Sequence, residues 1–342
     1  MGKKVLVTGG TGYIGSHTSV ELINAGYDVA IIDNLYNSEK SVLDGIEKIS
    51  GKRPVFEEFD LCDIKKLEEF LNNRFKPDAI IHFAAYKAVG ESVNKPLEYY
   101  RNNLLSLINI LEMMDKYGIP SLVFSSSCTV YGQPDVLPVT ESAPVKPALS
   151  PYGSTKQIGE EIIRSTMAAK PQMKAVSLRY FNPIGAHPSA LIGELPRGVP
   201  ENLVPYITQT AIGLRSELKV FGSDYNTPDG SCIRDYLHVV DLAKAHVAAL
   251  DRLINSKNRK NYEVFNLGTG KGVSVLEAIG SFERVSGVKL NYTITKRREG
   301  DIEQIWADPS YANRELGWKT ESSLDDAMAT AWKWEKRIRN KK

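Results

Sequence analysis

Short apolar runs alternate with amphipathic stretches through the first half of the chain. The runs at 5–7, 29–32, 55–59, 77–85 (a loop and a strand), 121–124 and 175–181 are typical of buried parallel strands. Residues 96–117 carry apolar side chains at helical spacing. This alternation predicts an α/β fold with a doubly wound parallel sheet of the Rossmann type.

Three glycines, Gly9, Gly12 and Gly15, follow the first apolar run and open a helical pattern. The first glycine permits a tight turn, the second lets the backbone approach a phosphate, and the third lets helix and strand pack closely. A strand, a glycine-rich turn and a helix in this order seat the pyrophosphate of a dinucleotide at the helix N-terminus. The glycine spacing alone also fits a tight turn without a ligand.

Asp33 ends the second apolar run, a little over 20 residues beyond the turn. A carboxylate at this strand tip accepts hydrogen bonds from the adenosine ribose hydroxyls and repels a 2′-phosphate. The sequence therefore predicts NAD, and not NADP, as the cofactor.

The composition changes after Pro183, where loops rich in glycine, proline and asparagine replace the regular alternation. We expect residues 1–182 to form the NAD-binding Rossmann domain and residues 183–342 a smaller α/β substrate domain. The boundary is approximate, and the chain is free to cross it again. A site between the two domains is expected.

Charge and cysteine content exclude several classes of protein. The 342 residues include 43 basic and 41 acidic ones, so an electrostatic binder of nucleic acid or of anionic membranes is not expected. Three widely spaced cysteines form no metal or disulfide pattern, which favours a reducing, cytoplasmic location without a metal. No apolar run has the ~20 residues of a membrane span.

Tyr152 and Lys156 lie four residues apart in a helical pattern, so they share one face. A tyrosine with an ordinary pKa of ~10 is no base at neutral pH, but a lysine and an oxidised nicotinamide both favour the phenolate. Lowering this pKa by ~3 units takes ~4 kcal/mol. Ser127, just past a strand, can orient the same substrate oxygen. An isolated pair of this spacing is usually a solvated helix face, but here it follows the glycine-rich turn and the acidic strand tip.

These motifs resemble the extended short-chain dehydrogenase/reductase superfamily and, within it, the UDP-glucose 4-epimerase (UDP-galactose 4-epimerase) family. The resemblance runs from about residue 4 to about residue 334. It is carried by the stretches 9–17, 87–92, 125–132, 179–183, 234–239 and 297–301.

The resemblance implies a role for each of several residues. Ser127, Tyr152 and Lys156 would be catalytic. Besides these three and the glycines Gly9, Gly12 and Gly15, the cofactor would contact Tyr13, Ile14, Asp33, Asn34, Leu35, Tyr36, Asn37, Ser38, Asp60, Leu61, Phe83, Ala84, Ala85, Tyr86, Lys87, Asn102 and Phe181. The substrate would contact Ser127, Tyr152, Asn182, Asn202, Leu203, Phe221, Arg234, Tyr236, Arg298, Asp301 and Ile305. Arginines suit the bidentate binding of a pyrophosphate.

The implied activity is the NAD-dependent interconversion of UDP-glucose and UDP-galactose. The sugar is oxidised at C4, the 4-keto intermediate rotates to present its other face to the cofactor, and the hydride returns to that opposite face. The UDP-sugar would be the small-molecule partner, and a homodimer is expected. Related 4,6-dehydratases carry an Asp-Glu pair where this chain has Cys128 and Thr129, so that activity is disfavoured.

Other activities stay open. Some family members carry a bulky tyrosine at the position of Ile305, and a smaller side chain leaves room for an N-acetyl group. UDP-GlcNAc and UDP-GalNAc are therefore alternative or additional substrates. Another NAD-dependent sugar-nucleotide enzyme, an ordinary dehydrogenase that releases NADH and a non-catalytic NAD sensor are further alternatives.

Overall fold

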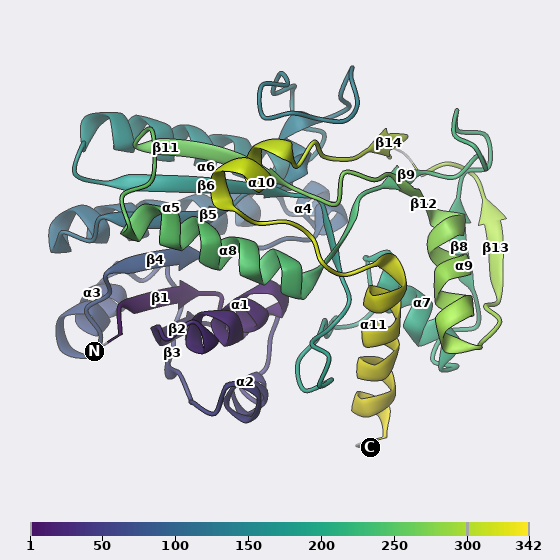
Figure 1. Ribbon diagram of the computed structural model, residues 1–342, viewed down its shortest axis with the longest axis horizontal. Coiled ribbons are helices and arrows are strands. Elements are labelled where there is room, and N and C mark those ends of the chain that lie inside the picture. Colours follow the sequence, from purple (N-terminus) through teal and green to yellow (C-terminus); the bar gives the residue numbers. More distant parts are fainter. Residues whose placement is uncertain (1, 299–300, 341–342) are drawn as a thin grey trace.

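The computed structural model describes residues 2–298 and 301–340 (Figure 1). Its largest element is a seven-stranded parallel sheet with the strand order β11-β6-β5-β4-β1-β2-β3. The strands are β1 (Lys4–Thr8), β2 (Asp28–Asp33), β3 (Val55–Glu58), β4 (Ala79–His82), β5 (Ser121–Ser125), β6 (Lys174–Tyr180) and β11 (Tyr262–Leu267).

The strands β1 to β6 coincide with the predicted apolar runs, but β11 comes from the second half of the chain. It pairs with β6 from Tyr262 opposite Ala175 to Leu267 opposite Tyr180. The chain thus returns to the first sheet long after residue 182. The division into domains at that residue stays a prediction.

Helices cover both faces of the large sheet, which confirms the doubly wound architecture. Apolar side chains of α1 (Tyr13–Asn24), α2 (Val42–Ser50), α8 (Val239–Ile254) and α10 (Ser310–Leu316) form one core with the sheet. Those of α3 (Ile64–Asn73), α5 (Pro96–Tyr117) and α6 (Pro151–Ala169) form a second core on the opposite face. Figure 1 shows α1 and α8 side by side on one face.

A smaller group of elements lies beyond the carboxyl ends of the central strands (Figure 1). It has its own apolar core, built on α7 (Leu203–Ala211), β8 (Leu218–Phe221), α9 (Val275–Ser286) and α11 (Leu324–Arg339). β13 (Tyr292–Thr295) pairs with β8. Short strands connect this group to the large sheet: β7 (Asn182–Ile184) with β10 (Tyr236–His238), and β9 (Ile233–Arg234) between β12 (Val273–Ser274) and β14 (Gln304–Ile305). The remaining short helices are α4 (Val89–Asn94) and a 3-10 turn, η1 (Cys128–Tyr131).

Within residues 2–298 and 301–340, no helix has the length and apolar character that a membrane crossing needs. In the same part of the chain, no group of three or more His, Cys, Asp or Glu side chains is arranged to hold a metal ion.

Candidate active site

The glycine-rich turn connects β1 to α1 and leaves no room for side chains. A Cβ at Gly15 would lie 2.3 Å from the carbonyl oxygen of Gly9, and a Cβ at Gly9 would lie 2.8 Å from the backbone nitrogen of Ala84. Gly12 is the N-cap of α1, where no side chain caps the helix and no acidic residue occupies the first turn. The first N–H groups of α1 are therefore suited to an anion such as a pyrophosphate.

Asp33 ends β2 beside this turn and organises the loop that follows. Its carboxylate accepts hydrogen bonds from the backbone nitrogens of Thr11 (3.2 Å) and Leu35 (2.9 Å) and from the hydroxyl of Ser38 (3.2 Å). The carboxylate thereby joins the glycine-rich turn to the predicted ribose-binding loop, residues 34–38. Asn37 is exposed in the same loop.

The loops after β2, β3 and β4 meet at this edge of the sheet. The side-chain amide of Asn34 donates to the Asp60 carboxylate at 3.1 Å, and the rings of Tyr36 and Tyr86 lie 4.6 Å apart. The carbonyl oxygen of Leu61 accepts from the buried Asn109 at 2.8 Å. Residues predicted to contact the cofactor are thus brought together from three strand ends.

The other predicted cofactor residues line the turn after β4 and the start of α1. The backbone nitrogen of Phe83 donates to Thr8 at 3.0 Å, and the next residues, Ala84 and Ala85, are half-buried. Tyr13 and Ile14 begin α1, and the Tyr13 hydroxyl donates to the carbonyl oxygen of Gly185 at 2.7 Å.

Asn103 fixes the loop after β4, although the sequence singled out only its neighbour Asn102 as a cofactor contact. Its side chain accepts from the Tyr86 nitrogen (2.8 Å) and donates to the Tyr86 carbonyl oxygen (3.0 Å) and to the Thr155 hydroxyl (3.1 Å). Asn102 donates to Asn103 at 2.9 Å. The sequence indicates this role of Asn103 only by placing a polar residue on the buried face of a predicted helix.

The structure brings Ser127, Tyr152 and Lys156 together, all nearly buried. Ser150 caps α6 by accepting from the Gly153 nitrogen, so that the helix starts just before the tyrosine. The Lys156 ammonium donates to the carbonyl oxygen of Ser125 at the end of β5 (2.6 Å) and lies 5.8 Å from the centre of the Tyr152 ring. Ser127 follows as the N-cap of η1.

Burial dominates the acid–base properties of this group. It raises the pKa of Tyr152, the nearby Tyr180 adds to the rise, and a hydrogen bond with Ser127 opposes it. Burial lowers the pKa of Lys156 to about 8, against the opposing charge of Glu160. Burial therefore opposes the phenolate form of Tyr152 within this group.

A buried ion pair, which the sequence analysis missed, supports the segment 125–127. Arg179 on β6 and Glu160 on α6 form two parallel hydrogen bonds of 2.9 and 2.5 Å, and the Ser126 hydroxyl donates to the same carboxylate at 2.5 Å. Arg179 also donates to the Tyr131 hydroxyl at 2.9 Å. The one indication in the sequence is the spacing: Glu160 lies four residues after Lys156, so both share one face of α6.

The predicted nucleotide-binding residues gather on the short strands of the smaller group. Arg234 and Arg298 both donate to the Asp301 carboxylate, at 3.0 and 3.3 Å. The Arg298 guanidinium lies 5.6 Å from the centre of the half-exposed Phe221 ring. Two arginines and an exposed aromatic face are the groups that a nucleoside diphosphate needs. Glu299 and Gly300 of the same motif lie outside the described residues.

Strand register and packing bring several of the other predicted substrate residues together in pairs. Arg234 is opposite Ile305 in the β9–β14 pair, and Asn182 is opposite Tyr236 in the β7–β10 pair. Phe181 and Ile305 pack in one apolar cluster. Asn202 is the N-cap of α7 and Leu203 its first residue.

Asp235 lies in the stretch 234–239 between two predicted substrate residues, and no role was predicted for it. Its buried carboxylate accepts from the backbone nitrogens of Thr269 (2.8 Å), Gly270 (3.2 Å) and Ala307 (3.2 Å). Burial raises its pKa, and these hydrogen bonds oppose the rise. The side chain ties the strand that carries Arg234 and Tyr236 to the loops around it.

Comparison with known proteins agrees with this geometry. Residues 5–268 match the NAD dependent epimerase/dehydratase family. The chain belongs to this family. A UDP-glucose 4-epimerase of Dictyostelium discoideum is 49% identical over 332 residues, which cover 97% of this chain and 95% of the relative.

Two crystal structures are similar over nearly the whole chain. A UDP-glucose 4-epimerase from Stenotrophomonas maltophila, with bound NAD and formylated UDP-arabinopyranose, has a TM-score of 0.96 and 47% identity, with 99% of this chain and 100% of that one covered. A UDP-glucose 4-epimerase from Bifidobacterium longum, in complex with NAD+ and UDP, has a TM-score of 0.94 and 47% identity, with 99% of each chain covered.

Proposed function

We propose that this protein is an NAD-dependent epimerase that interconverts UDP-glucose and UDP-galactose at sugar C4. The observation that carries the proposal is the buried group of Ser127, Tyr152 and Lys156, in a chain that also has a dinucleotide-type glycine-rich turn and two arginines suited to a diphosphate. The similarity to UDP-glucose 4-epimerases over 97% of the chain supports it.

The residues at the glycine-rich turn fit NAD. The close backbone contacts at Gly9 and Gly15 require glycine at both positions, as in a tight phosphate-binding turn, and the uncapped start of α1 offers N–H donors to the pyrophosphate. The Asp33 carboxylate next to them suits ribose hydroxyls. When bound, NAD supplies the acceptor, and then the donor, of the hydride at C4.

Tyr152 is the acid–base group of the proposed reaction. Its phenolate would accept the proton of the sugar 4-hydroxyl as the hydride leaves C4, and would return a proton to the same oxygen when the hydride returns to the opposite face of C4. Because the hydride is returned, the net redox state does not change. Ser127 hydrogen-bonds the same sugar oxygen and orients it. Lys156, fixed by the Ser125 carbonyl oxygen, supplies positive charge beside the ring.

Arg234 and Arg298 hold the diphosphate of the substrate, with Asp301 between them. Phe221 offers its face to the uracil. Firm binding of the nucleotide with few contacts to the sugar allows the 4-keto sugar to turn its other face to the cofactor. Residues 1–182 then carry mainly the cofactor, and residues 183–342 mainly the UDP-sugar.

The experiment that tests this proposal is incubation of the purified protein with UDP-galactose and no added cofactor. We expect UDP-glucose to form without a steady rise in the absorbance of reduced nicotinamide. A dehydrogenase would require added NAD and show that rise, and a sensor would convert nothing; either result would overturn the proposal.

UDP-GlcNAc is a second candidate substrate because of the residue at position 305. Ile305 is 2% exposed and packs in the cluster of Phe181 and Val130 near the catalytic group. An isoleucine there occupies less volume than the tyrosine of some relatives. The smaller side chain favours room for an N-acetyl group.

A homodimer is also part of the proposal. The neighbouring helices α5 and α6 keep apolar side chains in solvent: Leu105, Ile108 and Ile158 are 37–38% exposed, and Leu97 is 76% exposed. A second copy of the chain would cover this face. Light scattering tests it: a dimer mass is expected, and a monomer mass would contradict it.

The location in the cell is proposed to be cytoplasmic. Cys62, Cys128 and Cys232 are free thiols, which supports a reducing compartment.

A further inference from the structure

One segment, residues 185–202, runs between β7 and α7 and reaches back to the cofactor-binding half. We call it the bridging segment. Its Arg197 guanidinium donates to the carbonyl oxygens of Tyr36 (2.7 Å) and Ser38 (2.6 Å). Both carbonyls belong to the loop that follows Asp33, which is predicted to hold the adenosine ribose. The side chain of Arg197 thus holds this loop through two of its carbonyl oxygens.

Glu194 of the bridging segment contacts a second cofactor-binding loop. Its carboxylate accepts from the Lys87 ammonium at 3.0 Å, and its side chain is only 11% exposed. Lys87 follows β4 and is a predicted cofactor residue. The same carboxylate oxygen accepts from the side-chain amide of Asn202 at 2.6 Å. The cofactor side and the nucleotide side therefore meet at one carboxylate.

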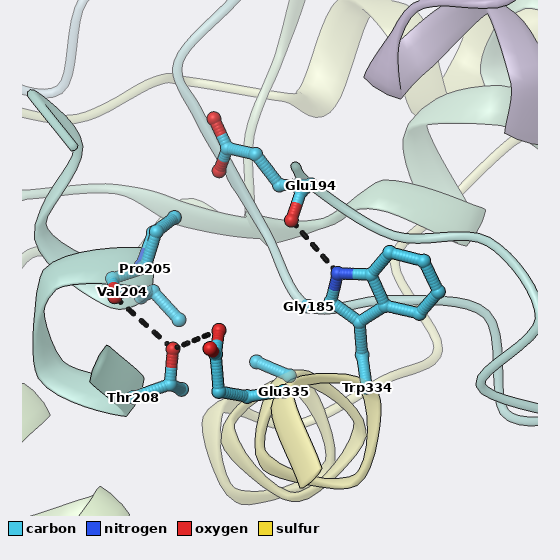
Figure 2. A pocket seen from close by; sticks show the side chains of 8 residues that line it. Gly185, Glu194, Val204, Pro205, Thr208, Trp334 and Glu335 are labelled. Atoms are coloured by element: carbon cyan, nitrogen blue, oxygen red, sulfur yellow. Dashed lines mark hydrogen bonds between the residues drawn. The ribbon is translucent and has the colours of Figure 1, made fainter. Parts of the chain in front are cut away.

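The bridging segment is anchored firmly on its other side. Trp334 on α11 donates to the backbone oxygen of Glu194 at 2.8 Å, and Figure 2 shows the Glu194 carboxylate pointing away from the indole. A Cβ at Gly193 would lie 2.6 Å from the Trp334 ring, so the chain rests directly on it. Lys333 donates to the carbonyl oxygen of Pro188 at 2.7 Å. Glu194 and Arg197 therefore extend from a fixed base.

We propose that Arg197 and Glu194 are positioning residues that hold the two cofactor-binding loops closed, so that the cofactor stays bound while sugar nucleotides exchange. The inference rests on the proposed function, because an epimerase must return the hydride from the same cofactor molecule. Neither residue is placed to touch the reacting atoms. Their loss changes the lifetime of the bound cofactor and not the chemical step.

The test compares NAD release from wild type, Arg197→Met and Glu194→Gln, measured as NAD in the filtrate of the cofactor-loaded protein over time. The controls are Arg284→Met and Glu69→Gln, which remove the same charges at exposed positions outside the bridging segment and the contacts described above. Arg197→Met removes two hydrogen bonds that an exposed guanidinium makes to the loop. We expect this variant to release NAD about fivefold faster than wild type. Saturating added NAD should restore kcat in both test variants.

Release rates equal to those of wild type and controls would overturn the inference. A kcat that added NAD does not restore would also overturn it, since it would indicate a structural or catalytic role. A wild type that keeps no cofactor and converts no UDP-galactose would overturn the proposed function itself, and the inference with it.

Discussion

The Lys156 ammonium nitrogen lies 5.8 Å from the centre of the Tyr152 ring, held there by a hydrogen bond to the carbonyl oxygen of Ser125. The lysine is thus fixed by the end of β5 and not by the tyrosine. Because burial raises the pKa of Tyr152, the lysine and the cofactor must together offset the loss of solvation.

Tyr152→Phe is expected to lower kcat by about 10³-fold, since it removes the acid–base group and little else. The phenyl ring keeps the apolar contacts, so the variant should fold and retain NAD. Product formation from UDP-galactose and the bound NAD per chain are the measurements. A variant with wild-type kcat would remove Tyr152 from the role of base.

The ion pair of Arg179 and Glu160 is expected to be costly to break. Both side chains are about 5% exposed, so Arg179→Met leaves an unpaired carboxylate in the core and should lower the free energy of unfolding by about 3–5 kcal/mol. Urea unfolding measures the loss.

The double variant Arg179→Met/Glu160→Gln is the matched control, because it removes both charges. It should lose clearly less stability than Arg179→Met alone. Equal losses in the two variants would show that the pairing of charge is not what stabilises this part of the core.

The sheet could be predicted from the sequence, and the residues of the candidate catalytic group could be picked out, because both depend on local patterns. The run ending at Asp33 and the pair Tyr152 and Lys156 are visible as spacing alone. β11 was not anticipated, since the pairing of Tyr262 with Ala175 joins residues far apart in the chain. The roles of Asp235, Glu160 and Arg197 could not be predicted for the same reason, because their hydrogen bonds are made to distant segments.

Acid should destabilise the fold through three buried histidines. Burial lowers the pKa of His17 and His82 to about 3 and that of His246 to about 4. The unfolded chain binds protons at these side chains as the pH falls below ~6.5, whereas the folded chain does not until far lower pH. The stability that these histidines contribute is therefore fully present above pH ~6.5. As the pH falls further, each histidine lowers the free energy of unfolding by up to about 1.4 kcal/mol per pH unit.

Urea unfolding at about pH 7.5 and about pH 5.5 measures this effect. The variant His246→Asn should show a smaller loss, because the amide cannot titrate but can still hydrogen-bond the carbonyl oxygen of Leu242. Equal stability at the two pH values would contradict the prediction.

Ile305→Tyr should abolish turnover of UDP-GlcNAc while UDP-galactose is still converted. Ile305 packs in one apolar cluster with Phe181, and a larger ring at this position would take up the room that we propose for the N-acetyl group. Side-by-side product assays of wild type and variant measure the change, and Ile305→Leu is the volume-matched control. A wild type inert toward UDP-GlcNAc would refute the second substrate.

The central claim is that the hydrogen on sugar C4 leaves and returns to the same carbon while the cofactor stays bound. The most direct test is the conversion of UDP-glucose carrying deuterium at C4, in ordinary water and without added NAD. The account predicts UDP-galactose with the deuterium still at C4. Loss of the label to solvent, or a requirement for added cofactor in every turnover, would contradict it.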